Sequence, residues 1–258
     1  MKQYSFIHVF GKCKAPPQNE WKNNVRGGIN RLYYIIGGEG GYYIKGEKRY
    51  FKKGLIYFIP AYDNIPTWSS YESPEKQLDH LYASIEILPP IITNDVIEID
   101  PKEDPVIEAA LFAWMRIAEK YRYIRNIDSE ALEYLKANVN YIISRMIDRS
   151  NIKTLDDKTI LSALEEIHRN IASHISVHDI AKNAHMSYDG FIKKFKSELR
   201  TTPYQYIKAL KMRTAAALRD EGATLEEAAE RCGYSDSSAL LHALSAKNDL
   251  KKPGKAKS

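Results

Sequence analysis

The sequence predicts two domains of different fold class, an N-terminal all-β domain with two linking helices after it and a C-terminal all-α domain. Three observations predict this division. Short β-branched and aromatic runs separated by glycines fill residues 1–100. Two long stretches with apolar residues at helical spacing follow in residues 101–147. Two helix-turn-helix patterns joined by one long helix occupy residues 158–258, after a polar linker at 148–157.

The N-terminal hundred residues read as a small antiparallel barrel or sandwich. Apolar runs at 32–36, 42–44 and 55–59 alternate with Gly37-Gly38, Gly40-Gly41 and other turn residues. The segment is dense in tyrosine, whose rings suit stacking on a sugar while the hydroxyl bonds to its edge. The alternative is that about half of these rings fill the barrel and the rest lie on its outer face.

The two middle stretches predict amphipathic helices. Asp104 is placed to cap the first and Pro105 to open it, and the second begins near Ser129. Each carries an unusually complete apolar stripe. These stripes can pack on the β domain, or a surplus apolar face can form a symmetric contact between two copies of the chain.

The first helix-turn-helix pattern runs from Ser176 to Pro203. On a helical wheel, Phe191, Phe195 and Leu199 share one apolar arc with Ile192, while basic residues cluster opposite, and Ser187 stands at the N-cap position. An ordinary helix pair with a solvated lysine face would show the same pattern. The candidate DNA-contacting residues are Ser187, Tyr188, Asp189, Ile192, Lys193, Lys194, Lys196 and Arg200.

A second unit from Thr224 to Lys247 makes the DNA-reading interpretation more specific. Thr224 and Glu227 form a capping box, and Gly233 supplies the turn. Its candidate contact residues are Ser237, Leu241 and His242. A helix from Pro203 to Arg219, about 25 Å long, would hold the two reading helices about one duplex turn apart.

Charge favours the first unit as the principal reading head. From Ser187 to Arg213 seven cationic residues oppose two acidic ones, a local balance of +5. The second reading helix, 236–246, holds no Lys or Arg. Because phosphate neutralisation supplies most nonspecific affinity, we expect the first unit to dominate binding. The tail lysines either add phosphate contacts or are simply solvated: Lys247, Lys251, Lys252, Lys255 and Lys257.

Composition excludes several other classes. The chain has 258 residues, 44% of them apolar, and a net charge of +5, which mildly favours an anionic partner. Its cysteines, Cys13 and Cys232, form no metal motif and fit a reducing cytoplasm. We expect no membrane span and no signal peptide. With only His8 and His80 in the first hundred residues, we expect neither a metal site nor catalysis, and no cofactor.

The run from Ser176 to Asp236 resembles the DNA-binding domain of AraC/XylS-type transcription regulators. The resemblance rests on residues such as Ile180-Ala181, Phe195-Lys196, Thr202-Pro203 and Gly233-Tyr234-Ser235-Asp236. The sequence departs from the family pattern where Lys193 replaces Arg, Arg200 replaces Gly and His242 replaces Arg. More loosely, the glycine and tyrosine pattern of residues 41–54 resembles the cupin-type sensing domain of such regulators. The resemblance to their sugar-sensing members implies Trp68, His80 and Tyr82 as the candidate ligand-binding residues.

The resemblance implies a cytoplasmic, ligand-responsive transcription regulator. It would bind double-stranded DNA as a homodimer, respond to a sugar or other small metabolite, and contact the transcription machinery. Two alternatives stay open. One is a DNA-binding dimer that no longer needs a ligand. The other is a cupin-like sugar-binding module or enzyme whose helical half binds proteins.

Overall fold

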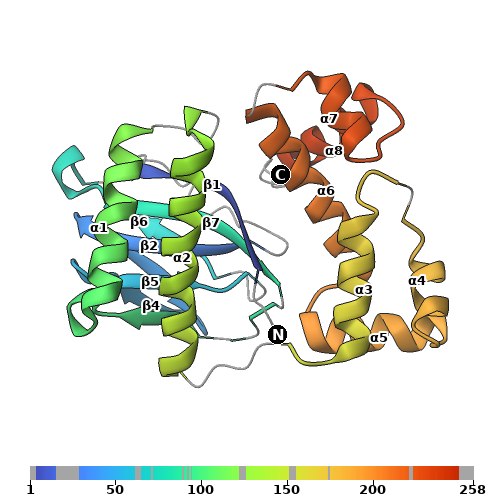
Figure 1. Ribbon diagram of the computed structural model, residues 1–258, viewed down its shortest axis with the longest axis horizontal. Coiled ribbons are helices and arrows are strands. Elements are labelled where there is room, and N and C mark those ends of the chain that lie inside the picture. Colours follow the sequence, from blue (N-terminus) through green and yellow to red (C-terminus); the bar gives the residue numbers. More distant parts are fainter. Residues whose placement is uncertain are drawn as a thin grey trace, which may run out of the picture.

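The structure is a computed structural model, and it contains a β-sheet domain beside a helical domain (Figure 1). It describes residues 4–15, 29–61, 65–70, 72–88, 90–91, 93, 95–121, 126–150, 155–173, 175–220 and 223–249. Of the tail lysines, Lys247 lies in the last described helix, and Lys251, Lys252, Lys255 and Lys257 lie outside the described residues. The N-terminal β region and C-terminal helical region agree with the predicted order of fold classes.

Two antiparallel sheets form the N-terminal domain in the described part of the chain. The larger has the strand order β1-β7-β2-β5-β8 and the smaller the order β4-β3-β6. The strands are β1 (Tyr4–Lys14), β2 (Asn30–Gly37), β3 (Gly40–Ile44), β4 (Glu47–Tyr50), β5 (Ile56–Ile59), β6 (Thr67–Ser69), β7 (Asp79–Leu88) and β8 (Ile97–Ile99).

The sheets are separate, so the described strands do not close into the cupin-like barrel that the sequence predicts. Gly37-Gly38, expected to make a simple turn, instead carries the chain from the larger sheet to the smaller one. Gly38 has φ +75°, and a Cβ there would lie 1.9 Å from the carbonyl oxygen of Gln77. Only glycine fits this crossing without displacing the backbone at Gln77.

Helices α1 (Pro105–Lys120) and α2 (Ser129–Ser150) cover one face of the larger sheet (Figure 1). The predicted cap is confirmed, because the Asp104 carboxylate accepts hydrogen bonds from the backbone N–H groups of Val106 and Ile107. Trp114 of α1 is fully buried in the core beneath the helices. Arg145 of α2 pairs with Asp104 at 3.2 Å, which ties the two helices together.

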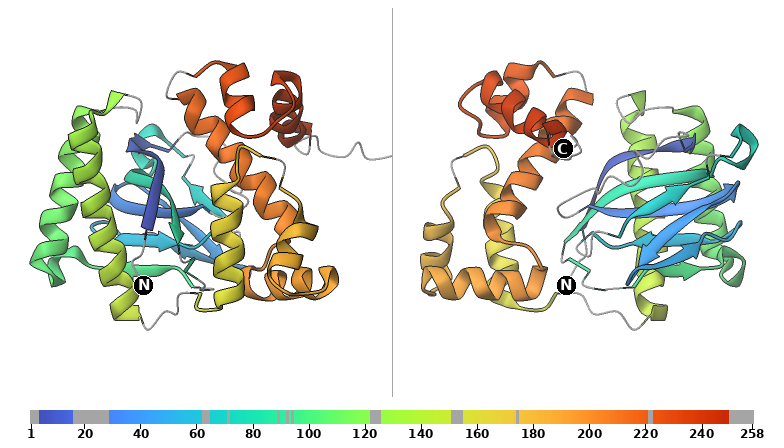
Figure 2. Two further views of the ribbon diagram at one scale, coloured as in Figure 1. Left: turned by 45° about the vertical axis from the view of Figure 1, so that its right-hand side comes forward. Right: turned by 180° about the vertical axis from the view of Figure 1, so that it is seen from behind.

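The helical domain follows α2 in the chain and lies beside the sheet domain (Figure 2). Leu155 begins its core, which is continuous through the helices that carry the first helix-turn-helix unit. Within the described residues, none of the helices has the length and apolarity to cross a lipid bilayer. The helices are α3 (Lys158–Arg169), α4 (Val177–Asn183), α5 (Tyr188–Leu199), α6 (Pro203–Asp220), α7 (Leu225–Arg231) and α8 (Ser237–Asp249).

Candidate nucleic-acid interface and sensing site

The first helix-turn-helix unit consists of two capped helices, α4 and α5. The Ser176 hydroxyl accepts a hydrogen bond from Asp179 N at 3.3 Å, and the Ser187 hydroxyl accepts one from Gly190 N at 3.2 Å. Ser187 is therefore the N-cap of α5, as the sequence predicts. Between the helices, His185 takes a left-handed conformation with φ 54°, which turns the chain sharply.

The apolar side of α5 is fixed in the core of the domain. Phe191, Phe195 and Leu199 are completely buried, in agreement with the predicted arc. Ala181 of α4 is also buried, and its small side chain lets the two helices approach closely. This packing determines which side of α5 faces solvent.

The exposed side of α5 carries the predicted basic face. Lys193 and Lys196 are exposed, Asp189 lies in the first turn and is exposed, and Ile192 is half-buried between the two faces. Tyr188 is 42% exposed, and its ring stacks on that of His178 in α4, with centroids 5.0 Å apart and planes 17° apart. The unit thus presents two lysines and a supported aromatic ring on one solvent-facing surface.

Two further predicted contact residues are partly engaged within the protein. The Lys194 ammonium lies 2.7 Å from the carboxylate of Asp157, the N-cap of α3, and this hydrogen bond raises the pKa of Lys194. Arg200 ends α5 in the left-handed conformation, with φ 55°, at the position where the sequence departs from glycine. Its side chain is exposed beyond the end of the helix.

Helix α6 links the two units and carries three of the cations in the sequence count, of which two are engaged within the protein. Lys211 donates hydrogen bonds to the carbonyl oxygens of Ser173 and Gly233, both at 3.1 Å, and burial lowers its pKa. Arg213 is buried against Glu86 of the sheet domain at 3.0 Å. With Lys194 also paired, the basic surface rests on fewer cations than the local balance of +5 suggests.

The second unit is held by a capping box and a small core. Thr224 and Glu227 exchange the two predicted hydrogen bonds, at 2.7 and 3.2 Å. Gly233 provides the turn with φ +63°. Its core is built mainly from small side chains: Ala215, Ala228, Ala229, Cys232 and Leu240.

The described side chains of the second reading helix, α8, are uncharged or weakly polar. Its cap is Asp236, whose carboxylate accepts a hydrogen bond from Ala239 N at 2.7 Å. Ser237 is half-buried, whereas Leu241 and His242 are exposed. The predicted contact residues of α8 therefore occupy one helix with no described cation among them.

The three predicted ligand-binding residues do not form one cluster. The rings of His80 and Tyr82, both on β7, lie 5.7 Å apart on one side of that strand. Trp68 on β6 packs against Tyr50 with centroids 5.1 Å apart, and the Lys48 ammonium lies 3.7 Å above its ring. Burial lowers the pKa of His80 to about 4, so this imidazole is neutral at physiological pH.

Sequence reasoning missed a buried arginine close to this region. Arg31 on β2 is 8% exposed, and its guanidinium donates to the Thr67 hydroxyl at 3.1 Å and the Ile65 carbonyl at 2.6 Å. The signal was an arginine at the start of a run that is otherwise apolar. Such a residue is expected to have internal partners.

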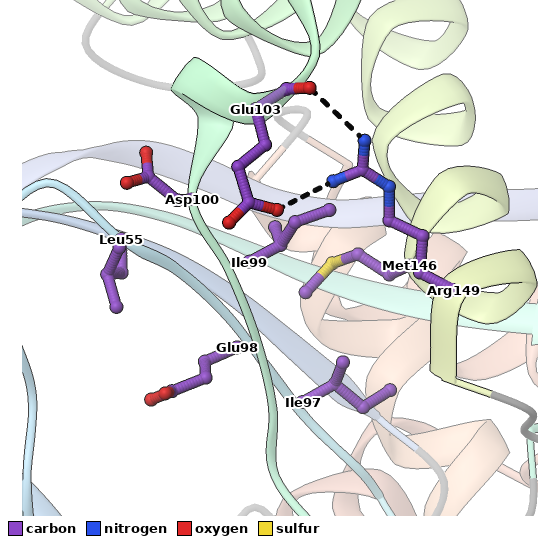
Figure 3. Close-up of a pocket in the computed structure, with 8 residues that line it drawn as sticks. All are labelled: Leu55, Ile97, Glu98, Ile99, Asp100, Glu103, Met146 and Arg149. Atoms are coloured by element: carbon purple, nitrogen blue, oxygen red, sulfur yellow. Dashed lines mark hydrogen bonds and ion pairs between the residues drawn. The ribbon is translucent and has the colours of Figure 1, made fainter.

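A pocket of about 390 Å³ opens where β8 meets α2 (Figure 3). Arg149 closes one side by pairing with Glu103 at 3.2 Å, and Glu98 and Asp100 lie on the opposite side (Figure 3). None of the predicted ligand-binding residues lines it. Across the described residues, no group of His, Cys, Asp and Glu side chains is arranged to hold a metal ion.

Comparison with protein families found a match to the family described as "Helix-turn-helix domain", over residues 180–247. The match begins in α4 and ends in α8, so it includes both candidate reading helices. A search of the curated proteins found no match to the sequence.

Among solved structures, ToxT from Vibrio cholerae has a similar fold along nearly the whole chain. One ToxT structure shares 13% sequence identity and a TM-score of 0.58, over 96% of this chain and 95% of that chain. A second, with an unsaturated fatty acid bound, gives 13% and 0.58 over 94% and 91%. A third, bound to (E)-4-(8-methylnaphthalen-1-yl)but-3-enoic acid, gives 13% and 0.58 over 95% of each.

At this identity the likeness to ToxT concerns the fold, and the family match concerns the C-terminal residues. Both agree with the capped helix pairs, the linking helix and the basic surface described above. The chain carries, in residues 180–247, a DNA-binding helix-turn-helix domain of the AraC type.

Proposed function

We propose that this protein is a sequence-specific, ligand-responsive transcription regulator that acts as a homodimer in the cytoplasm. The observation that carries the proposal is the fixed orientation of α5. Its core residues Phe191 and Phe195 are fully buried, so Lys193 and Lys196 face solvent on the opposite side. A capped helix with one buried and one basic face is the form in which helix-turn-helix proteins enter the major groove.

The contact residues divide by their chemistry. Lys193, Tyr188, Asp189 and Ile192 lie on the early turns of α5, and we assign them to base edges. Ser187, Lys196 and Arg200 are assigned to phosphates, because helix N-termini and cationic side chains bind them without reading sequence. Lys194 is assigned to a phosphate as well, which requires its ion pair with Asp157 to open. In α8, we assign Ser237 and His242 to polar edges and Leu241 to thymine methyl groups.

The domain organisation follows from the same proposal. Residues 1–100 form the sensing domain, 101–147 the helical dimerisation segment, 148–157 the linker and 158–258 the DNA-binding domain. Phe112 and Val106 on α1 and Tyr134 on α2 support the dimerisation segment, since these apolar side chains are 61%, 54% and 60% exposed. Large exposed apolar side chains are typical of a protein interface where they gather in one patch.

The sheet domain is proposed to bind a small-molecule effector. The aromatic residues of β7 and the buried Arg31 offer both apolar area and a hydrogen-bond donor group for an acidic or hydroxylated molecule. The ToxT structures with bound organic acids support testing that ligand class beside the sugars that tyrosine density suggests. These residues are proposed to bind the effector, and no catalytic role is proposed for them.

The test is a selection of bound fragments from a random DNA library, using the full chain at one fixed salt concentration. We expect one sequence to be enriched. Its half-site should contain two adjacent major-groove segments, one for each reading helix. Affinity for that sequence, measured by fluorescence anisotropy, should change when the matching sugar or fatty acid is added. No enrichment would contradict DNA reading, whereas enrichment without any effector response would favour a ligand-independent regulator.

A further inference from the structure

One carboxylate of the sheet domain is buried among polar groups of the helical domain. Glu86 lies near the end of β7, between Ile85 and Ile87, and is only 3% exposed. A charged side chain at such a position requires partners, because burial of an unpaired carboxylate is very costly. Its side-chain partners Arg213, Tyr206 and His168 belong to the helical domain.

Three side chains from two helices converge on one oxygen of Glu86. The Arg213 guanidinium and the Tyr206 hydroxyl, both on α6, lie 3.0 and 3.3 Å from Oε1. His168 on α3 places Nε2 3.3 Å from the same oxygen and 2.9 Å from the Tyr206 hydroxyl. We call this group, Glu86 with His168, Tyr206 and Arg213, the Glu86 cluster.

The cluster is built as an interior contact. The side chain of Arg213 is 8% exposed and that of Glu86 is 4% exposed, so bulk water does not screen their attraction. Two residues further along β7, Leu88 packs against the core of the helical domain. The end of β7 is therefore held against α3 and α6 by ionic and hydrogen-bond contacts and by apolar packing.

The same strand also carries the candidate sensing residues. Alternate side chains of a strand point to the same face, so His80, Tyr82 and Glu86 share one face of β7. The opposite face, with Leu81, Ala83 and Ile85, packs in the core beneath α1 and α2. A displacement of β7 at Tyr82 would therefore be transmitted directly to Glu86.

We propose that the Glu86 cluster is an autoinhibitory latch between the sheet domain and the DNA-binding domain. While Glu86 contacts Arg213, α6 is held in one orientation, and the positive charge of Arg213 is neutralised inside the protein. When this contact opens, the Glu86 carboxylate moves away from the DNA-binding domain and the Arg213 guanidinium becomes available at its surface. Both changes strengthen the attraction of that domain to DNA. The inference rests on the proposed function, because it assumes that α6 links two DNA-reading units.

The test uses the full chain with Glu86→Gln, and Glu47→Gln as the matched control, since the Glu47 side chain is 68% exposed on β4. Small-angle X-ray scattering should show a larger radius of gyration for Glu86→Gln only. Its affinity for a DNA fragment enriched from a random library should rise about 3- to 10-fold, while the control stays within about 1.5-fold of the original protein.

A milder variant keeps the test valid if Glu86→Gln fails to fold. Tyr206→Phe removes one donor but retains the ring, and should give a smaller change in the same direction for both measurements. Unchanged scattering and unchanged or weaker DNA binding in both variants would overturn the latch. If no variant binds DNA, the proposed function fails, and the scattering result still decides whether the cluster holds the domains together.

Discussion

The ammonium of Lys211 donates a hydrogen bond of 3.1 Å to the carbonyl oxygen of Gly233, and so joins α6 to the turn of the second helix-turn-helix unit. The same ammonium bonds to the carbonyl oxygen of Ser173, in the segment that precedes α4. One side chain thus ties the linking helix to the second unit and to the segment that precedes the first. The relative placement of the two reading helices depends on this contact and on the glycine that permits it.

Gly233→Ala should destabilise the protein more than a substitution in a surface turn usually does. Gly233 has φ +63°, and a Cβ would lie 2.8 Å from both the Ala172 carbonyl oxygen and the Lys211 ammonium. We expect a loss of roughly 2–3 kcal/mol in the free energy of unfolding, from backbone strain and displaced neighbours. Urea denaturation measures it.

Gly46→Ala separates the cost of backbone strain from the cost of displacing neighbouring atoms. Gly46 has φ +82°, but no atom lies within 4 Å of a Cβ built there. This control should cost only about 1 kcal/mol, the strain of the left-handed backbone. Equal losses in the two variants would mean that the Lys211 contact adds nothing at Gly233.

Arg200→Gly should separate stability from DNA binding. Arg200 ends α5 with φ 55°, a conformation that glycine adopts without strain. We expect the free energy of unfolding to rise by up to about 1 kcal/mol, while DNA affinity falls because a cation is lost. Arg200→Asn, which also tolerates this conformation, is the control for backbone strain.

Salt dependence completes that test. If Arg200 neutralises one phosphate, the slope of log affinity against log salt concentration should become less steep by about 1. An unchanged slope would place Arg200 away from the DNA.

The pH dependence of stability should report His80. Burial lowers its pKa from 6.5 to about 4, so the folded protein resists protonation that the unfolded chain accepts. Between these values the unfolded state binds more protons. Stability is therefore complete above pH 6.5 and falls as the pH decreases toward 4, by roughly 3 kcal/mol from this group.

The His80→Phe variant isolates the effect, because other groups titrate in the same range. The difference in unfolding free energy between the two proteins should vary with pH only in that window. A constant difference from pH 7 to pH 4 would show that His80 is solvated in solution.

Phe112→Ser should weaken self-association. Phe112 on α1 is 61% exposed, and burying it in a symmetric interface would contribute roughly 2 kcal/mol per copy. Sedimentation velocity should show a dimer dissociation constant raised by at least tenfold. Tyr204→Ser, which removes a 70% exposed ring from α6, is the control and should leave the dimer intact.

The sequence predicts local features of this fold better than distant ones. Caps such as Asp104, Ser187 and Thr224 mark helix starts, because each capping hydrogen bond joins residues no more than three positions apart in the sequence. The burial of Phe191 and Phe195 follows from helical periodicity.

Contacts between distant residues were not predictable in the same way. Glu86 and Arg213 are 127 positions apart, and no local pattern specifies their pairing. The crossing at Gly38 was also missed, since a glycine pair marks a turn without showing which strands it joins. A polar residue within an apolar strand, as at Arg31 and Glu86, signals a buried partner but does not identify it.

The account depends most on α5 as the principal reading helix. The direct test compares Lys193→Ala, His242→Ala and the control Lys53→Ala, an exposed lysine of the sheet domain, on the selected DNA at one salt concentration. Lys193→Ala should cost roughly 1–3 kcal/mol and relax the choice of base at one position, with much smaller losses for the other two. A Lys193→Ala protein that binds as tightly and as selectively as the original would contradict it.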